Sequence, residues 1–124
     1  MAYPRLSCSV SVRPLPEQSD PATGRHAFKY TVTIRNSGDV TAQLIGRHWI
    51  ITDANGHVDE VRGLAVVGHQ PVLKPGESFE YTSWILLATP HGTMRGTFFC
   101  MTEDAQPFDA PIDEFGLTLA SALH

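Results

Sequence analysis

Residues 47–71 read RHWIITDANGHVDEVRGLAVVGHQP, and this stretch decides the fold. Its Asn-Gly pair tolerates the left-handed backbone angles of a tight hairpin, so the sequence predicts a turn at residues 53–56. A strand is expected on either side of that turn, at residues 40–52 and 57–62. Gly46 lies inside the first of these strands, where an isolated glycine indicates a β-bulge or the close approach of another backbone.

The rest of the chain repeats this β pattern. Apolar residues alternate with polar ones in short segments, and Gly and Pro separate the segments. In the clearest case, Leu6, Cys8 and Val10 alternate with serines, which predicts one face packed on a core. Further strands are expected at residues 28–35, 79–87, 93–102 and 112–119, and a single helical turn is expected near residues 120–123.

Seven or eight short strands joined by turns predict an all-β protein. We expect an antiparallel two-sheet β-sandwich of the immunoglobulin or fibronectin type III kind, with an open barrel as the alternative. The chain has 124 residues, which is long enough for one hydrophobic core. A single domain over residues 1–124 is therefore expected.

The composition bears on the class of function. A hydrophobic fraction of 42% and a charged fraction of 18% are typical of a soluble globular protein. The net charge is −4 and the nine Lys and Arg residues are scattered, so nucleic-acid binding is not expected. No apolar run is long enough for a signal peptide or a membrane span. We therefore expect no membrane insertion and a cytoplasmic location.

The two cysteines are expected to be reduced thiols. Cys8, Trp49 and Cys100 occur in the order that immunoglobulin domains use for a disulfide packed on a tryptophan. However, Cys8 falls on the first expected strand, whereas the immunoglobulin bridge begins on the second. Both cysteines lie on apolar faces, which is typical of buried, unreactive thiols.

The loop Gly63–Gly68 resembles the glycine-rich fingerprint of dinucleotide-binding proteins. That fingerprint requires a helix directly after the loop, and Pro71 and Pro75 exclude one here, so a Rossmann site is rejected. Successive backbone N–H groups in such a loop can still form a nest for a small anion, such as the pyrophosphate of a nucleotide. The alternative is an ordinary connecting loop.

Two arginines support the anion hypothesis. If Thr52 pairs with His57 across the turn, Arg47 lies opposite Arg62, and two facing cations need a negative partner. That partner is either a bound anion or the neighbouring Asp59 and Glu60 carboxylates. The candidate anion-binding residues are therefore Arg47, Arg62, Gly63, Ala65 and Gly68.

Metal binding and catalysis receive less support. The hairpin carries several potential ligands without the repeated spacings of a zinc site, so no metal site and no cofactor are predicted. Direct Mg²⁺ or Co²⁺ binding stays a weaker hypothesis, because magnesium needs only one or two carboxylates and water. No nucleophile is tied to a base and a carboxylate, so the chain is not expected to be an enzyme. The hairpin residues concerned are His48, Asp53, His57, Asp59 and Glu60.

Trp84 is the candidate for a partner surface. In its strand it alternates with Phe79 and Tyr81, which places it on the opposite face. If that face is uncovered, the indole is exposed, and tryptophan is enriched at interaction hot spots. The alternative is a tryptophan at the edge of the core.

Residues 47–53, 63–71, 75–76, 81–83, 89–90 and 92–96, with residue 112, form a set of sequence blocks. Together these blocks resemble the ApaG family, also called CorD. The resemblance covers nearly the whole chain and is weaker before residue 27. Two positions depart from the family pattern: Ala65 replaces a glycine that is frequent in the loop, and Trp84 follows the Thr-Ser pair where glycine is usual.

The resemblance implies a fibronectin type III-like β-sandwich in a small bacterial cytoplasmic protein whose biochemical role is unsettled. It also implies an association with cobalt tolerance and magnesium efflux. Similar domains in eukaryotic F-box proteins and in a polymerase-interacting protein look like protein-interaction modules. We therefore expect a non-enzymatic module that binds a protein partner, with small-anion or nucleotide binding as the alternative. Whether an edge strand also pairs two copies into a homodimer is left open.

Overall fold

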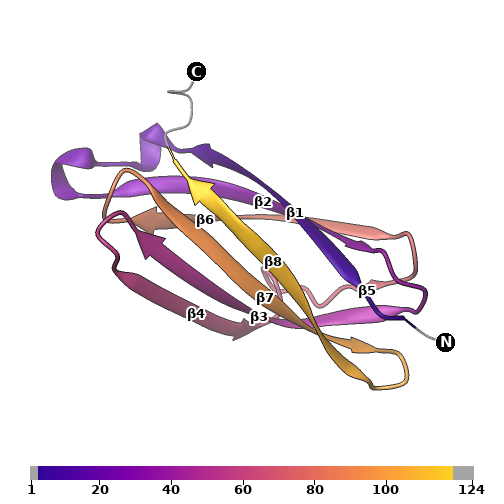
Figure 1. Cartoon of the computed structure of the whole chain (residues 1–124). Coiled ribbons are helices and arrows are strands. Elements are labelled where there is room, and N and C mark those ends of the chain that lie inside the picture. Colours follow the sequence, from indigo (N-terminus) through magenta and orange to yellow (C-terminus); the bar gives the residue numbers. More distant parts are fainter. Residues whose placement is uncertain (1–2, 119–124) are drawn as a thin grey trace.

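A computed structural model describes residues 3–118 as two packed antiparallel sheets (Figure 1). This confirms the expected all-β two-sheet sandwich. The helical turn expected near residues 120–123 lies outside the described residues. Two short 3-10 helices, η1 and η2, occupy the loop after the first strand. The elements are β1 (Leu6–Pro14), η1 (Pro16–Gln18), η2 (Pro21–Thr23), β2 (His26–Asn36), β3 (Ala42–Asp53), β4 (Val58–Leu64), β5 (Val72–Leu73), β6 (Ser78–Leu87), β7 (Gly92–Thr102) and β8 (Pro107–Leu117).

The strand order is that of a fibronectin type III-like sandwich. One sheet has the order β1-β2-β6, and the other has the order β4-β3-β7-β8, with the short β5 paired to β3. Within each sheet all pairings are antiparallel. Among residues 3–118, no helix has the length and apolar character needed to span a membrane.

The core lies between the sheets and is centred on Trp49. Its indole packs edge-on against the rings of Tyr30, Phe98 and Phe115, with ring centroids 5.7, 6.0 and 6.0 Å away. Phe28 and Phe98 are completely buried. Burying side chains of this size contributes about 1.5–3 kcal/mol each, so alternating apolar residues on β2, β3 and β7 hold the two sheets together.

Two β-bulges set which side chains face this core. The pairing of β3 with β7 shifts between Leu44 and Gly46, which confirms the irregularity expected at Gly46. The pairing of β7 with β8 shifts at Gly96, where a side chain would overlap the carbonyl oxygen of His48. A bulge shifts the alternation by one residue. After the first bulge, Trp49 therefore points inward and His48 points outward.

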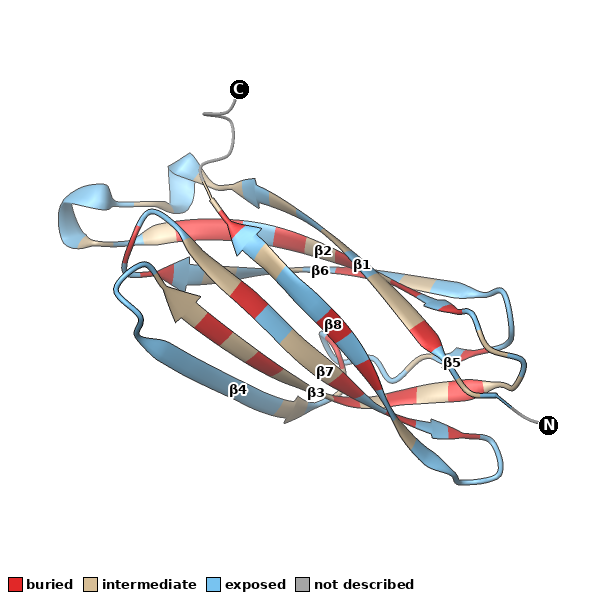
Figure 2. Cartoon of the chain, in the orientation of Figure 1, coloured by how far each residue is buried: buried red, intermediate tan, exposed pale blue. Residues whose placement is uncertain are grey.

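The edges of the larger sheet differ in exposure. Strand β8 begins at Pro107, earlier than the expected residue 112, and includes Pro111. Prolines are tolerated there because β8 is an edge strand, so the missing N–H groups break no ladder. Strand β4, at the other edge, is exposed along nearly its whole length (Figure 2).

Candidate functional site

The β3–β4 hairpin has a register that differs by one residue from the expected one. Thr52 pairs with Val58 rather than with His57. The N–H of Asp53 donates to the carbonyl of His57 at 2.9 Å, so residues 54–56 form a three-residue loop. Gly56 ends this loop with a φ of 83°, the left-handed conformation that three-residue hairpins use at this position.

The corrected register separates the two arginines of the anion hypothesis. Arg47 pairs with Gly63, and Arg62 pairs with His48. Since successive residues of a strand point to opposite faces, Arg47 lies on the core side of the sheet and Arg62 lies on the outer side. The expected pair of facing arginines is therefore wrong, and the one-residue difference in loop length is the reason.

Arg62 has a carboxylate neighbour on the outer face. Its guanidinium lies 3.7 Å from Glu60, and the same Glu60 oxygen lies 2.7 Å from Nε2 of His48. The hydrogen bond with His48 lowers the pKa of Glu60, and the charges of His48, Arg62 and Arg95 act in the same direction. Glu60 is therefore an anion at neutral pH that offsets the cations around it.

Arg47 is hydrogen-bonded to the end of β4 and to the loop that follows it. Its Nη1 donates to the carbonyl oxygens of Leu64 and Ala65 at 3.0 and 2.9 Å. The guanidinium lies over Gly63, where an added Cβ would be 2.6 Å from Nη1. Arg47 thus fastens the loop to β3 through backbone carbonyls, and Gly63 provides the space for it.

The loop itself is a tight turn with an unusual backbone. Val66 and His69 exchange two backbone hydrogen bonds of 2.8 and 2.9 Å, and Val66 is completely buried. Ala65, Val67 and Gly68 all have positive φ, at 68°, 47° and 81°. Ala65 therefore adopts the left-handed conformation despite its Cβ. The loop leads into β5 rather than into a helix, in agreement with the rejection of a Rossmann site.

Two buried polar groups lie on the inner side of the sandwich. Within residues 3–118, neither Nε1 of Trp49 nor the hydroxyl of Tyr81 has a hydrogen-bond partner. Burial raises the pKa of Tyr81, and the positive charge of Arg47 acts in the opposite direction. A buried hydroxyl without a partner costs about 1–3 kcal/mol, so Tyr81 is a weak point of the core.

The candidate metal ligands of the hairpin are divided between two faces. His48 and Glu60 lie on the outer face, whereas Asp59 is opposite Ile51 on the inner face, 3.3 Å from His57. Asp53 is occupied in the turn, where it accepts from two backbone N–H groups. In the described part of the chain, no three His, Cys, Asp or Glu side chains gather closely enough to hold a metal ion.

Trp84 lies on the outer face of the smaller sheet and is 58% exposed. It pairs with Lys29 of β2 across the strand interface. The indole lines a shallow hollow with a volume of about 400 Å³, together with Leu15, Gln18, Lys29, Thr82 and Ser83. Of the two arrangements considered from the sequence, the structure has the exposed one.

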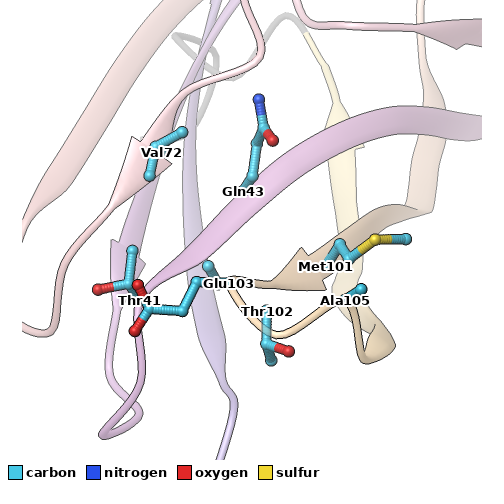
Figure 3. A pocket seen from close by; sticks show the side chains of 8 residues that line it. Thr41, Gln43, Val72, Met101, Thr102, Glu103 and Ala105 are labelled. Atoms are coloured by element: carbon cyan, nitrogen blue, oxygen red, sulfur yellow. The ribbon is translucent and has the colours of Figure 1, made fainter.

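Sequence reasoning missed a second exposed apolar surface, on the outer face of the larger sheet. Val72 and Met101 flank Gln43, because both residues pair with it from neighbouring strands. Their side chains line a hollow of about 310 Å³ that reaches Thr41 and Glu103 (Figure 3). Phe99 is exposed on the same face. The signal was the alternation of Phe99 and Met101 with inward-facing Phe98 and Cys100.

These features define a small all-β sandwich that combines a strained loop, an uncovered edge strand and exposed apolar side chains. The chain belongs to the ApaG family, because the ApaG domain model matches residues 16–102. It is 58% identical to protein ApaG of Ralstonia nicotianae over 124 residues, which covers all of both chains. It is 59% identical to protein ApaG of Acidovorax sp. over 115 residues, covering 91% of this chain and 84% of the relative.

A solved structure supports the same assignment. The crystal structure of the putative ApaA protein from Bordetella pertussis superimposes with a TM-score of 0.91 at 56% sequence identity, covering 94% of each chain. The fold expected from the resemblance is thereby confirmed.

Proposed function

We propose that this ApaG-family chain is a non-enzymatic module that binds a protein partner through the face carrying Trp84. The observation that supports the proposal is the exposed indole beside a hollow on the outer face of the smaller sheet. Exposing a tryptophan to water is unfavourable, and such residues supply much of the affinity where they occur at protein interfaces. The site takes a partner that inserts an apolar side chain beside the indole.

The residues around Trp84 define what kind of partner fits. Lys29 lies opposite Trp84 on the neighbouring strand. On the same outer face, the hydroxyl groups of Thr31 and Thr82 form a hydrogen bond of 3.0 Å. An apolar centre with a polar border is the usual arrangement of a protein interface, and Lys29 adds a positive charge next to the indole. We therefore propose a partner surface with an apolar centre and at least one carboxylate.

The test compares Trp84→Ala with a control on the same strand face. Leu86→Ala is the control, because Leu86 is also exposed and lies on the same face of β6, two residues after Trp84. Each tagged variant is cross-linked in lysate, and the captured proteins are quantified by mass spectrometry. We expect a set of proteins retained by the wild type and by Leu86→Ala and lost with Trp84→Ala. Equal capture by all three would refute a role for Trp84.

A second proposal is small-anion binding, including pyrophosphate of a nucleotide, at the Gly63–Gly68 loop. The specific observation is the positive φ of Ala65 and Val67, because non-glycine residues held in this conformation cluster at functional loops. An NMR titration with pyrophosphate and with ATP tests it. Saturable amide shifts at residues 65–69 would support the proposal, and their absence at millimolar ligand would remove it. Arg62→Ala serves as a control, because Arg62 lies on the other face of the sheet.

The link between the family and metal ions is proposed here to be indirect. Any contribution to cobalt tolerance or magnesium efflux, by a chain acting in the cytoplasm, would run through the protein partner. In support, His48 and Glu60 already bind each other at 2.7 Å, away from the other hairpin ligands. Isothermal calorimetry with Mg²⁺ and Co²⁺ provides the check, since saturable binding in the micromolar range would contradict an indirect role.

A further inference from the structure

We propose that two copies of this chain associate by pairing their β4 strands antiparallel, so that each sheet continues into the other. In this pairing a two-fold axis passes beside Val61, which lies opposite Val61 of the partner subunit. Glu60 then lies opposite Arg62 of the partner subunit. The proposal is independent of Trp84, which is on the other sheet.

Strand β4 lacks the proline, lysine and bulge that protect many edge strands. It is the last strand of its sheet, and six of its seven residues are exposed. Its sequence, VDEVRGL, has no proline and no lysine, and its pairing with β3 has no bulge. By contrast, β8 at the opposite edge carries Pro107 and Pro111 and contacts β1. An unprotected edge is a template for a further strand.

The backbone hydrogen bonds show which groups of β4 point outward. At one end Asp53 donates to the carbonyl of His57, and at the other end Ala65 donates to the carbonyl of Ile45. Antiparallel ladders alternate, so odd-numbered residues of β4 direct their N–H and C=O groups to β3. Even-numbered residues from Val58 to Arg62 direct theirs to the free edge, whereas the carbonyl of Leu64 accepts from Arg47. A second strand must therefore set even-numbered residues opposite even-numbered residues.

Charge then selects one register among those that remain. With Val61 on the axis, each Glu60 faces Arg62 of the partner subunit, which gives two opposite-charge pairs. If the two-fold axis passes beside Glu60 instead, each Glu60 lies opposite Glu60 of the partner subunit. If the axis passes beside Arg62, each Arg62 lies opposite Arg62 of the partner subunit. Like charges directly opposite destabilise a strand pair, whereas opposite charges contribute about 0.2–1 kcal/mol.

The same register brings apolar side chains together. Leu64, which is 75% exposed, lies opposite Val58 of the partner subunit on the outer face. On the inner face, Val61 lies against Val61 of the partner subunit. Three exposed apolar residues of one edge strand thus cover one another at once. An interface of one strand pair is small, so we expect weak association, with a dissociation constant of about micromolar or above.

Charge reversal tests the pairing in the full chain. Sedimentation velocity across a concentration series should show a monomer–dimer equilibrium for the wild type. Glu60→Arg and Arg62→Glu should each weaken association at least tenfold, and the double variant should restore it. Glu80→Arg is the control, because Glu80 is an exposed residue of β6 on the other sheet, and it should leave association unchanged. A monomer at every concentration up to about 1 mM, or no restoration by the double variant, would overturn the proposal.

A covalent trap gives a second, independent readout. Val61 faces itself at a site without hydrogen bonds between the copies, where Cα atoms are about 4.5 Å apart. That distance is within the range for a disulfide, so Val61→Cys should form a disulfide-linked dimer under mild oxidation. Val58→Cys should not, because it faces Leu64 of the partner subunit. A dimer that forms no disulfide with Val61→Cys would also overturn the register. Trp84→Ala should leave both readouts unchanged, which separates this proposal from the partner site.

Discussion

The guanidinium of Arg47 lies in the space that a side chain at Gly63 would occupy, with Nη1 2.6 Å from the position of an added Cβ. From there Nη1 donates to the carbonyls of Leu64 and Ala65. The requirement for glycine at position 63 thus has an internal cause. It arises from the arginine that fastens the loop rather than from a phosphate group approaching the backbone.

This relationship predicts strong coupling between the two positions. Gly63→Ala should lower the free energy of unfolding by about 1–2 kcal/mol, because the added methyl group displaces Arg47 from both carbonyls. Arg47→Ala should cost a similar amount. Combining the two should cost little more than either alone, because the interaction is already lost. Urea unfolding of the four proteins measures this, and additive losses would show that Gly63 matters for another reason.

The register of this hairpin shows what the sequence could not provide. The Asn-Gly signal correctly predicted the turn, but the number of loop residues was open. A one-residue change in register moves each side chain of β4 to the other face. It therefore decides whether Arg47 faces Arg62 or Gly63. The strands were predictable from alternation, whereas the neighbours of Arg47 depended on a one-residue difference in the pairing of β3 with β4.

The strained turn after β4 gives a second prediction. Val67 has a φ of 47°, and a left-handed conformation costs a non-glycine residue about 1–2 kcal/mol. Asparagine tolerates this conformation, so Val67→Asn should raise the free energy of unfolding by about 1 kcal/mol. Val72→Asn is a matched control, because the two valines are 58% and 57% exposed. Val72 lies in an extended strand, so its substitution should be neutral or destabilising.

Thermal and urea unfolding of both asparagine variants decide between strain and surface effects. Equal changes at positions 67 and 72 would mean that surface polarity, and not backbone strain, controls the result. A stable Val67→Asn variant that loses pyrophosphate binding would instead connect the strain to the loop's proposed function.

The unpartnered hydroxyl of Tyr81 leads to a third prediction. Tyr81→Phe removes a buried polar group that has no hydrogen-bond partner within residues 3–118 and keeps the ring that packs against Phe98. We expect the free energy of unfolding to rise or stay level, within about 1 kcal/mol. Tyr30→Phe is the comparison. A loss above 1 kcal/mol for Tyr81→Phe would reveal a partner for the hydroxyl, such as a buried water.

Other features of the structure were predictable to different degrees. Alternation identified the inner faces of β1, β2, β6 and β7, because one face of each strand must reach the core. The start of β8 at Pro107 was not predicted, because prolines are tolerated in a strand only at a sheet edge and the edge position of β8 follows from the whole fold. The exposure of Trp84 depended on whether another element covers its face. That is a property of the whole fold rather than of the strand.

The two thiols make the stability depend on pH, which is the last prediction. Burial raises the pKa of Cys8 and of Cys100 from 9.0 to about 12. Well below pH 9 both thiols are protonated in the folded and unfolded states, so the stability that they contribute is fully present. Above pH 9 the unfolded chain loses these protons while the folded chain keeps them. The folded state is therefore penalised progressively as the pH rises toward 12.

Between pH 8 and 10 the wild type should lose about 1 kcal/mol for each thiol from this effect. A Cys8→Ala/Cys100→Ala variant is less stable at pH 8 because it leaves space in the core, but its stability should fall less over the same interval. Urea unfolding at pH 8, 9 and 10 gives the two slopes. The tyrosines affect both proteins equally, so they cancel in the comparison. Parallel slopes would mean that the thiols ionise in the folded protein, and that water reaches the sulfur atoms between the sheets.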